Sequence, residues 1–145
     1  MTSTILLAED DDDDALLIRR ALRKADIDVP VHVVRDGVAA ADYLSGVGPY
    51  ADRERYPFPG LLLLDIKMPH RSGLEVLGWL RAQPAIGHLP VVVLTASREA
   101  RDVERAFELG ADSYVVKPGS AEEYLAVARA IGLHWLGTNE PPTEP

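Results

Sequence analysis

The feature that most constrains the fold of this chain is a regular alternation of short apolar runs with segments of helical periodicity. Each run is rich in branched residues and is bounded by Pro, Gly or Asp, which is typical of strands buried on both faces. The runs are Ile5–Ala8, Val31–Val34, Leu61–Leu64, Val91–Leu94 and Tyr114–Val116. After each run, apolar residues recur every three or four positions, so the sequence predicts five strands that alternate with five helices.

Five strand–helix units form a parallel sheet covered on both faces. Right-handed crossovers leave few ways to connect such units. We therefore predict an α/β fold, a single flavodoxin-like doubly wound (βα)5 domain with strand order 2-1-3-4-5. We assign residues 1–136 to this domain. Residues 137–145, which contain three prolines and no core residues, are expected to form a flexible C-terminal tail.

The composition excludes several classes of protein. The chain contains no cysteine, which rules out disulfide frameworks, thiolate nucleophiles and cysteine-ligated metals. Its net charge of −8 argues against nucleic-acid binding, which requires clustered Lys and Arg. The apolar runs are far shorter than the roughly 18 residues of a membrane span, and residues 1–4 leave no room for a signal peptide. We expect a cytoplasmic protein that binds neither nucleic acid nor membrane.

Three carboxylates follow the strands between which the predicted strand order reverses. Glu9 and Asp10 come directly after the first strand, and Asp65 follows the third. Ligands of doubly wound sheets bind at this point, outside the carboxyl ends of the strands. Carboxylates gathered there repel one another unless a cation lies between them. Mg²⁺ fits such a set of oxygen ligands, and Mn²⁺ is the alternative.

Two more polar side chains stand at the same edge, Thr95 at the end of the fourth strand and Lys117 after the fifth. A carboxylate nucleophile surrounded by a metal, a hydroxyl and an ammonium is suited to in-line phosphoryl transfer. Asp65 is then the nucleophile that becomes an aspartyl phosphate. Asp10 would bind the metal directly and Glu9 through a water, while Thr95 and Lys117 would each hold a phosphoryl oxygen.

Four segments, ILLAEDD, LLLLDIKMP, VVVLTAS and SYVVKP, resemble the signature motifs of the response-regulator receiver domain in order and spacing, and the resemblance extends from Thr4 to Leu136. It implies that a histidine kinase phosphorylates Asp65 and that a protein-interaction surface then switches. It implies a signalling protein rather than an enzyme, whose own catalysis is limited to phosphoryl capture and slow hydrolysis.

The resemblance also implies roles for individual residues. The backbone carbonyl of Lys67 would be a further metal ligand, and the side chains of Lys67 and Ser97 would modulate hydrolysis. Thr95 and Tyr114 would move together as the switch. The Lys117–Pro118 peptide bond would be cis.

A narrower resemblance concerns the loop SGVGPYADRERYPFPG, the RDG of residues 35–37 and the ending IGLHWL. These segments are similar to those of stand-alone regulators that pair with cyanobacterial and bacterial phytochrome histidine kinases. The expected partners are thus a phytochrome kinase and a second copy of the chain, bound through the fourth helix, fifth strand and fifth helix. Gly119 departs from the family pattern, because many receivers have Phe or Leu there.

Simpler explanations exist for each residue by itself. The run Asp11–Asp14 is accounted for by the attraction of carboxylates to a helix N-terminus. Thr95 alone could cap a helix, and Lys117 alone could be an exposed turn residue. Trp79 and Phe107 are expected in the core. The four histidines lie on separate elements, which argues against a zinc site.

Two other functions match parts of the sequence. A metal-dependent phosphatase with an Asp nucleophile has a second Asp two residues on, as Asp10 and Asp12 would provide. However, Asp14 stands where such enzymes have Thr or Val, and no insertion could form a substrate cap. A module that only docks to partners would have lost part of the chemical set, and here the set is complete.

Overall fold

The computed structural model describes residues 4–135, which form one five-stranded parallel sheet in the order β2-β1-β3-β4-β5. The strands are β1 (Ile5–Ala8), β2 (Val31–Val34), β3 (Leu61–Leu64), β4 (Val91–Thr95) and β5 (Ser113–Val116). The helices are α1 (Asp12–Lys24), α2 (Gly37–Ser45), the short 3-10 helix η1 (Gly48–Tyr50), α3 (Gly73–Arg81), α4 (Ala100–Glu108) and α5 (Ala121–His134). The predicted doubly wound fold and strand order are confirmed.

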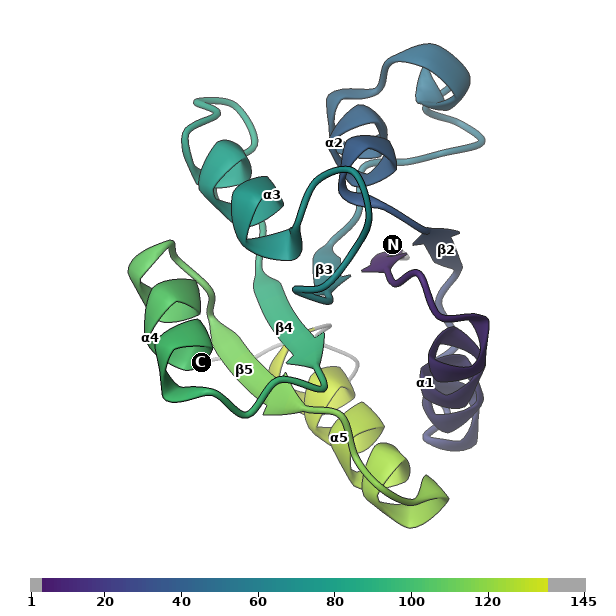
Figure 1. Cartoon of the computed structure of the whole chain (residues 1–145). Helices are drawn as coiled ribbons and strands as arrows, with labels where there is room; N and C mark the ends of the chain where they lie inside the picture. The colour runs from purple at the N-terminus through teal and green to yellow at the C-terminus, as the bar shows by residue number, and fades with distance from the viewer. Residues whose placement is uncertain (1–3, 136–145) are drawn as a thin grey trace, which may run out of the picture.

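Helices cover both faces of the sheet, with α1 and α5 on one side and α2, α3 and α4 on the other (Figure 1). Strand β3 lies at the centre of the sheet, so both of its faces are covered by helices. Leu61 and Leu63 pack toward α1 and α5, while Leu62 and Leu64 pack toward the other three helices. All four are at most 1% exposed. Because both faces of this strand are buried, it reads as an unbroken apolar run rather than an alternating one.

Three of the five predicted strands have the bounds of the apolar runs, whereas β4 extends to Thr95 and β5 begins at Ser113. The prediction that Phe107 lies in the core is wrong, because its side chain is 48% exposed. Ala106 is the buried residue of α4, and the next residue along a helix points about 100° away from it. The predicted tail, 137–145, lies outside the described residues.

The long segment between α2 and β3 is held in place by one arginine. Arg53 donates hydrogen bonds to the carbonyls of Tyr43 at 2.8 Å, Tyr56 at 3.0 Å and Leu44 at 2.9 Å. Two of these carbonyls belong to the last turn of α2, where the helix leaves its own acceptors unsatisfied. Arg53 therefore caps α2 and fixes the loop that follows it.

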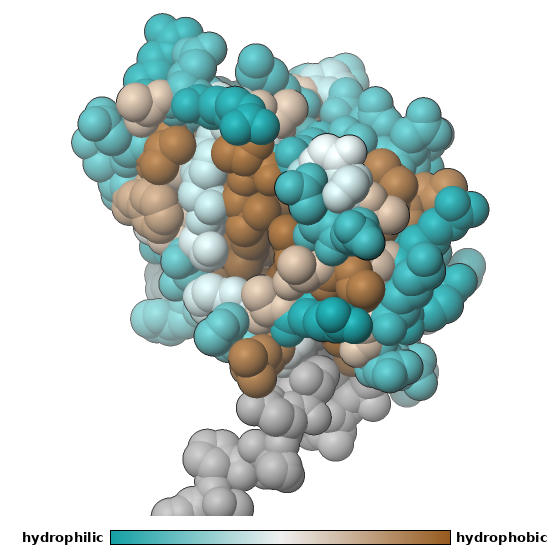
Figure 2. Space-filling model, turned by 90° about the horizontal axis from the view of Figure 1, so that it is seen from below, coloured by the Kyte–Doolittle hydropathy of each residue, from teal (hydrophilic) through white to brown (hydrophobic). Residues whose placement is uncertain are grey.

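On the side seen in Figure 2, hydrophilic residues predominate, and apolar ones form one strip and several smaller patches between them. Among residues 4–135, the exposed large apolar residues are Leu16, Leu17, Val38, Val47, Phe58, Phe107 and Leu133. Within residues 4–135, no helix is long and apolar enough to cross a membrane.

Helix α3 begins in direct contact with the end of β3. A Cβ atom on Gly73 would lie 1.9 Å from the backbone carbonyl oxygen of Asp65. The Gly73 amide also donates to the carbonyl of Ile66 at 2.8 Å. Only a residue without a side chain permits this approach, so Gly73 sets the position of the backbone that carries Asp65.

Gly73→Ala is expected to lower the free energy of unfolding by about 2 kcal/mol or more, because the added methyl group must displace the Asp65 carbonyl. Gly78→Ala is the matched control on the same helix, where the methyl group meets only Leu109 Cδ2 at 3.4 Å. That variant should gain about 0.5–1 kcal/mol from the higher helix propensity of Ala. Urea unfolding curves measure both values, and a Gly73→Ala protein as stable as the wild type would contradict the close approach.

Candidate functional site

The acidic residues that follow β1 and β3 are brought together by strand pairing. The parallel register sets Ala8 opposite Leu64, so the chain leaves both strands at the same level. The Asp65 amide then donates to the Ala8 carbonyl at 3.1 Å. On the other side of β1, the Glu9 amide donates to the Val34 carbonyl at 2.9 Å. These bonds extend the sheet by one residue and hold Glu9 and Asp65 side by side.

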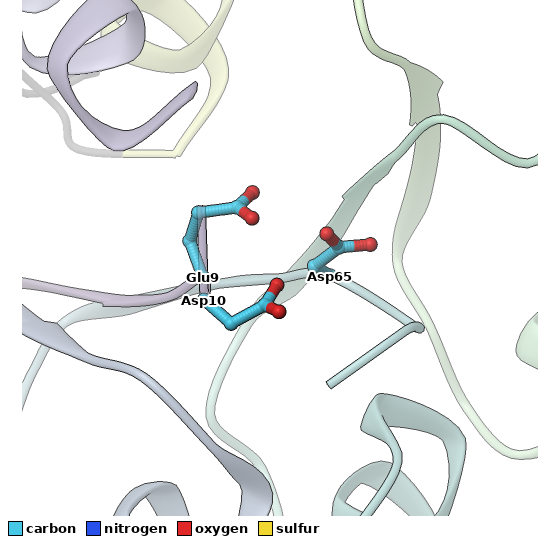
Figure 3. A group of neighbouring side chains, drawn as sticks. All are labelled: Glu9, Asp10 and Asp65. Atoms are coloured by element: carbon cyan, nitrogen blue, oxygen red, sulfur yellow. The ribbon is translucent and has the colours of Figure 1, made fainter. Parts of the chain in front are cut away.

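The carboxylates of Glu9, Asp10 and Asp65 face a common space at this edge of the sheet (Figure 3). One oxygen from each lies within 4.8 Å of the others. Glu9 is 2% exposed and Asp65 5% exposed, whereas Asp10 is exposed at the mouth of the site. Among residues 4–135, this is the one group of three or more His, Asp and Glu side chains close enough to share a cation.

Lys117 supplies the positive charge in this site. Its Nζ lies 2.9 Å from Asp65 Oδ2, 2.9 Å from Glu9 Oε1 and 2.7 Å from Asp14 Oδ2. The Lys117 side chain is only 12% exposed. An ammonium has three N–H donors, so these three carboxylates use all of them.

The charges of the site do not balance: Lys117 contacts three carboxylates, and a fourth, that of Asp10, lies in the same cluster as Glu9 and Asp65. Burial raises the pKa of Glu9 to about 7, and the charge of Asp65 adds to this, although hydrogen bonds from Lys117 and the Asp11 amide act in the opposite direction. Burial alone would lower the pKa of Lys117, but hydrogen bonds to Asp14, Glu9 and Asp65 outweigh it and raise that pKa. Lys117 therefore stays charged, while burial beside Asp65 makes the negative charge of Glu9 more costly than it would be in water.

This donor set fits a hard divalent cation. Carboxylate oxygens are the ligands that Mg²⁺ prefers, and Mg²⁺ is usually held by one or two carboxylates together with water. Asp10 is exposed, so the cluster is open to solvent on one side, which suits a cation that keeps several waters. The amide of Lys67 donates to Asp65 Oδ1 at 3.3 Å, which places the Lys67 backbone beside the same cluster.

The remaining residues predicted from the sequence lie at the ends of β4 and β5. Thr95 is buried, 1% exposed, and its carbonyl accepts the Lys117 amide at 2.7 Å. The Tyr114 hydroxyl donates to the carbonyl of Ser97 at 3.0 Å, and the Ser97 hydroxyl donates to Asp102 at 2.5 Å. Because Asp102 lies in the first turn of α4, these bonds connect the β4–α4 loop to both β5 and α4.

The predicted cis bond between Lys117 and Pro118 is wrong, because the described residues contain no cis peptide bond. The trans form of an X–Pro bond is favoured by about 0.5–1 kcal/mol. The amide of Lys117 already continues the β4–β5 ladder, and the trans bond leads from this ladder into α5.

Asp14 is the contact that the sequence did not reveal. Within the acidic run, Asp11 has a role in the helix itself. Its carboxylate caps α1 by accepting hydrogen bonds from the amides of Asp13 and Asp14. The side chain of Asp14 is different, because it reaches Lys117. Its spacing in the sequence could have indicated this contact. Asp14 lies four residues after Asp10, in the first turn of a helix that starts near the carboxyl end of β1.

Comparison with known proteins identifies the family to which this fold and this carboxylate site belong. The family model described as "Response regulator receiver domain" matches residues 5–129. The response regulator Rcp1 of Synechocystis sp. is 36% identical over 134 residues, covering 92% of this chain and 89% of that protein.

Two solved structures are similar over nearly the whole chain. The phosphorylated cyanobacterial phytochrome response regulator RcpA has a TM-score of 0.87 and 32% identity, covering 99% of this chain and 100% of that one. The Mn²⁺-bound form of Rcp1 has a TM-score of 0.83 and 35% identity, covering 97% and 99%. The family model matches most of the chain, and the strand order is the one predicted for this fold. The chain therefore belongs to the response-regulator receiver family.

Proposed function

We propose that Asp65 accepts a phosphoryl group from the phosphohistidine of a histidine kinase and that the acyl phosphate switches a protein-interaction surface. The observation that carries this proposal is the position of Asp65 Oδ2, 2.9 Å from the Lys117 ammonium. Asp65 is buried at the sheet edge and lies in a carboxylate cluster suited to a divalent cation. Membership of the receiver family supports the same role.

The reaction forms a bond between a carboxylate oxygen of Asp65 and phosphorus, while the phosphorus–nitrogen bond of the donor histidine breaks and its electron pair stays on the imidazole. Such transfers depend mainly on positioning and on stabilising the charge of the phosphoryl oxygens. Lys117 would turn one N–H from Asp65 to a phosphoryl oxygen. The Thr95 hydroxyl would donate to another.

Glu9, Asp10, Asp65 and the backbone carbonyl of Lys67 would hold Mg²⁺, with Mn²⁺ as a substitute. The cation would neutralise charge on the transferring phosphoryl group. The excess of carboxylates over ammonium groups in this structure supports a bound cation. The Mn²⁺-bound form of the similar regulator Rcp1 supports it as well.

The switch would run from Thr95 through the β4–α4 loop to Tyr114. In this structure the Tyr114 hydroxyl holds the Ser97 carbonyl, two residues after Thr95. A movement of Thr95 toward the phosphoryl group would pull this carbonyl away from Tyr114. The ring and α4 would then rearrange together, since Asp102 of α4 is bonded to the same loop. Ser97 and Lys67, beside the nucleophile, would modulate how fast water removes the phosphoryl group.

Incubation with acetyl phosphate and Mg²⁺ is expected to add the mass of one phosphoryl group to the intact protein. The adduct should require Mg²⁺ and be lost in alkali, as acyl phosphates are. Asp65→Asn should prevent it, because an amide is not a nucleophile of this kind. Asp13→Asn, which removes an exposed carboxylate of α1, is the control and should be phosphorylated like the wild type.

A folded wild-type protein that takes up no phosphoryl group in the presence of Mg²⁺ would contradict the proposal. That outcome would favour a module that only docks to partners. An adduct retained in Asp65→Asn would instead place the nucleophile on another residue, such as Asp10 of the phosphatase alternative.

Saturating Mg²⁺ is expected to raise the melting temperature of the wild-type protein. A cation at about one hundred times its Kd adds roughly 2.7 kcal/mol to the stability of the folded state, which corresponds to roughly 5–10 °C for a domain of this size. Asp10→Asn should lose most of this shift because it removes a ligand. Without Mg²⁺ it should be at least as stable as the wild type, since one repelling charge is gone.

Differential scanning fluorimetry with and without MgCl₂ measures both effects. An equal shift in Asp10→Asn and wild type would show that the cation binds elsewhere.

The proposal also includes the kind of kinase that donates the phosphoryl group. Its similarity to RcpA, a phytochrome response regulator, favours a phytochrome-type histidine kinase as donor, and the reaction would take place in the cytoplasm. Residues 1–136 would act as the receiver domain and 137–145 as a tail. The chain would be a signalling receiver whose own catalysis is limited to capturing and slowly hydrolysing the phosphoryl group.

A second copy of the chain would bind to the face formed by α4, β5 and α5. All four residues of β5, an edge strand, are only partly buried, and Phe107 of α4 exposes 48% of its surface. Symmetric dimers are the commonest homo-oligomers. Burying an exposed aromatic ring favours such an interface.

Phe107→Glu is expected to shift the protein from dimer to monomer, because a charge replaces the apolar contact. Val47→Glu is the matched control, since Val47 is also 48% exposed but lies in the segment after α2. Light scattering coupled to size-exclusion chromatography reports the mass of each. A wild-type monomer, phosphorylated or not, would exclude this dimer.

A further inference from the structure

We propose that Asp14 is a positioning residue for Lys117, the counter-ion that keeps the ammonium in place while its other two carboxylate partners engage the metal and the phosphoryl group. This inference rests on the proposed phosphoryl transfer to Asp65. It concerns a residue whose charge is otherwise explained by its place at the start of α1.

The three partners of Lys117 differ in what else they must do. Glu9 and Asp65 belong to the carboxylate cluster that could hold a cation, and Asp65 is also the nucleophile. Asp14 is outside that cluster, yet its contact with Lys117, 2.7 Å, is the shortest of the three. Of the three partners, Asp14 is therefore the one that is neither a proposed metal ligand nor the nucleophile.

The backbone that carries Asp14 is held by a helix cap and by packing of its helix. Its amide is bonded to the carboxylate of Asp11, the N-cap of α1. Buried residues of α1 pack with residues of α5, the helix that follows Lys117, in one core cluster. The Asp14–Lys117 pair thus connects the first turn of α1 to the end of β5, across 103 residues of sequence.

The reaction alters the other two constraints on Lys117. One N–H would leave Asp65 for a phosphoryl oxygen, and Glu9 would serve as a ligand of the cation as well as a partner of Lys117. Without Asp14, the ammonium at the end of a flexible four-carbon stem would then have no carboxylate partner without another role in the site. With Asp14 in place, one N–H stays anchored and the other two remain directed at the site of transfer.

The test measures the rate constant of phosphorylation by acetyl phosphate at a fixed donor concentration and saturating Mg²⁺. Asp14→Ala and Asp14→Asn are expected to lower this rate constant by about tenfold or more, the size of effect that a misplaced catalytic group produces. Asp13→Asn is the matched control: Asp13 is exposed in the same helical turn and has the same charge. It should react at nearly the wild-type rate.

Two readouts separate positioning from a general loss of charge. The Mg²⁺ concentration that gives half the maximal rate should rise strongly in Asp10→Asn and much less in Asp14→Asn, because only Asp10 is a proposed ligand. Asp14→Glu keeps a carboxylate within reach of Lys117 and should recover part of the lost rate. Melting curves confirm that each variant is folded.

Asp14 variants that react as fast as Asp13→Asn would overturn the inference. So would variants that require as much Mg²⁺ as Asp10→Asn but reach the wild-type rate, since Asp14 would then act on the cation. Failure of the proposed function looks different, because the wild-type protein itself would then take up no phosphoryl group.

Discussion

The contact between Lys117 and its three carboxylates is the interaction on which the rest of the site depends. It joins the ends of β1, β3 and β5 to the first turn of α1 through a single buried ammonium. Without that charge, Glu9 and Asp65 would be two buried carboxylates with no cation between them, which is costly in a protein interior. Burial raises the pKa of Glu9, and the charge of Asp65 adds to this effect. The excess of carboxylates makes the site receptive to a divalent cation.

The parallel sheet brings these groups together. All carboxyl ends of the five strands face one edge, so residues far apart in the chain meet there without long loops. Close backbone packing then fixes them, with Gly73 against the Asp65 carbonyl as the clearest instance. The energy that holds the site comes largely from apolar residues such as Leu61–Leu64, which are almost fully buried and take no part in the chemistry.

Much of this could be predicted from the sequence, since apolar runs mark buried strands and strand order determines which strand ends are neighbours. Glu9, Asp10, Asp65 and Lys117 were predicted to meet for that reason. Features that depend on side-chain direction could not be predicted in this way. Phe107 turns outward one position after a buried Ala, Asp14 reaches a lysine 103 residues away, and Arg53 caps α2 from a loop. The resemblance to receiver domains predicted a cis bond before Pro118, whereas the structure has a trans bond there.

The central claim is that Asp65, rather than another carboxylate of the cluster, carries the phosphoryl group. Reduction of the phosphorylated protein with borohydride converts an acyl-phosphate aspartate to homoserine, and tandem mass spectrometry of the peptides locates the change. Homoserine is expected at position 65 alone. Homoserine at position 10 would contradict this assignment and would place the nucleophile directly after β1.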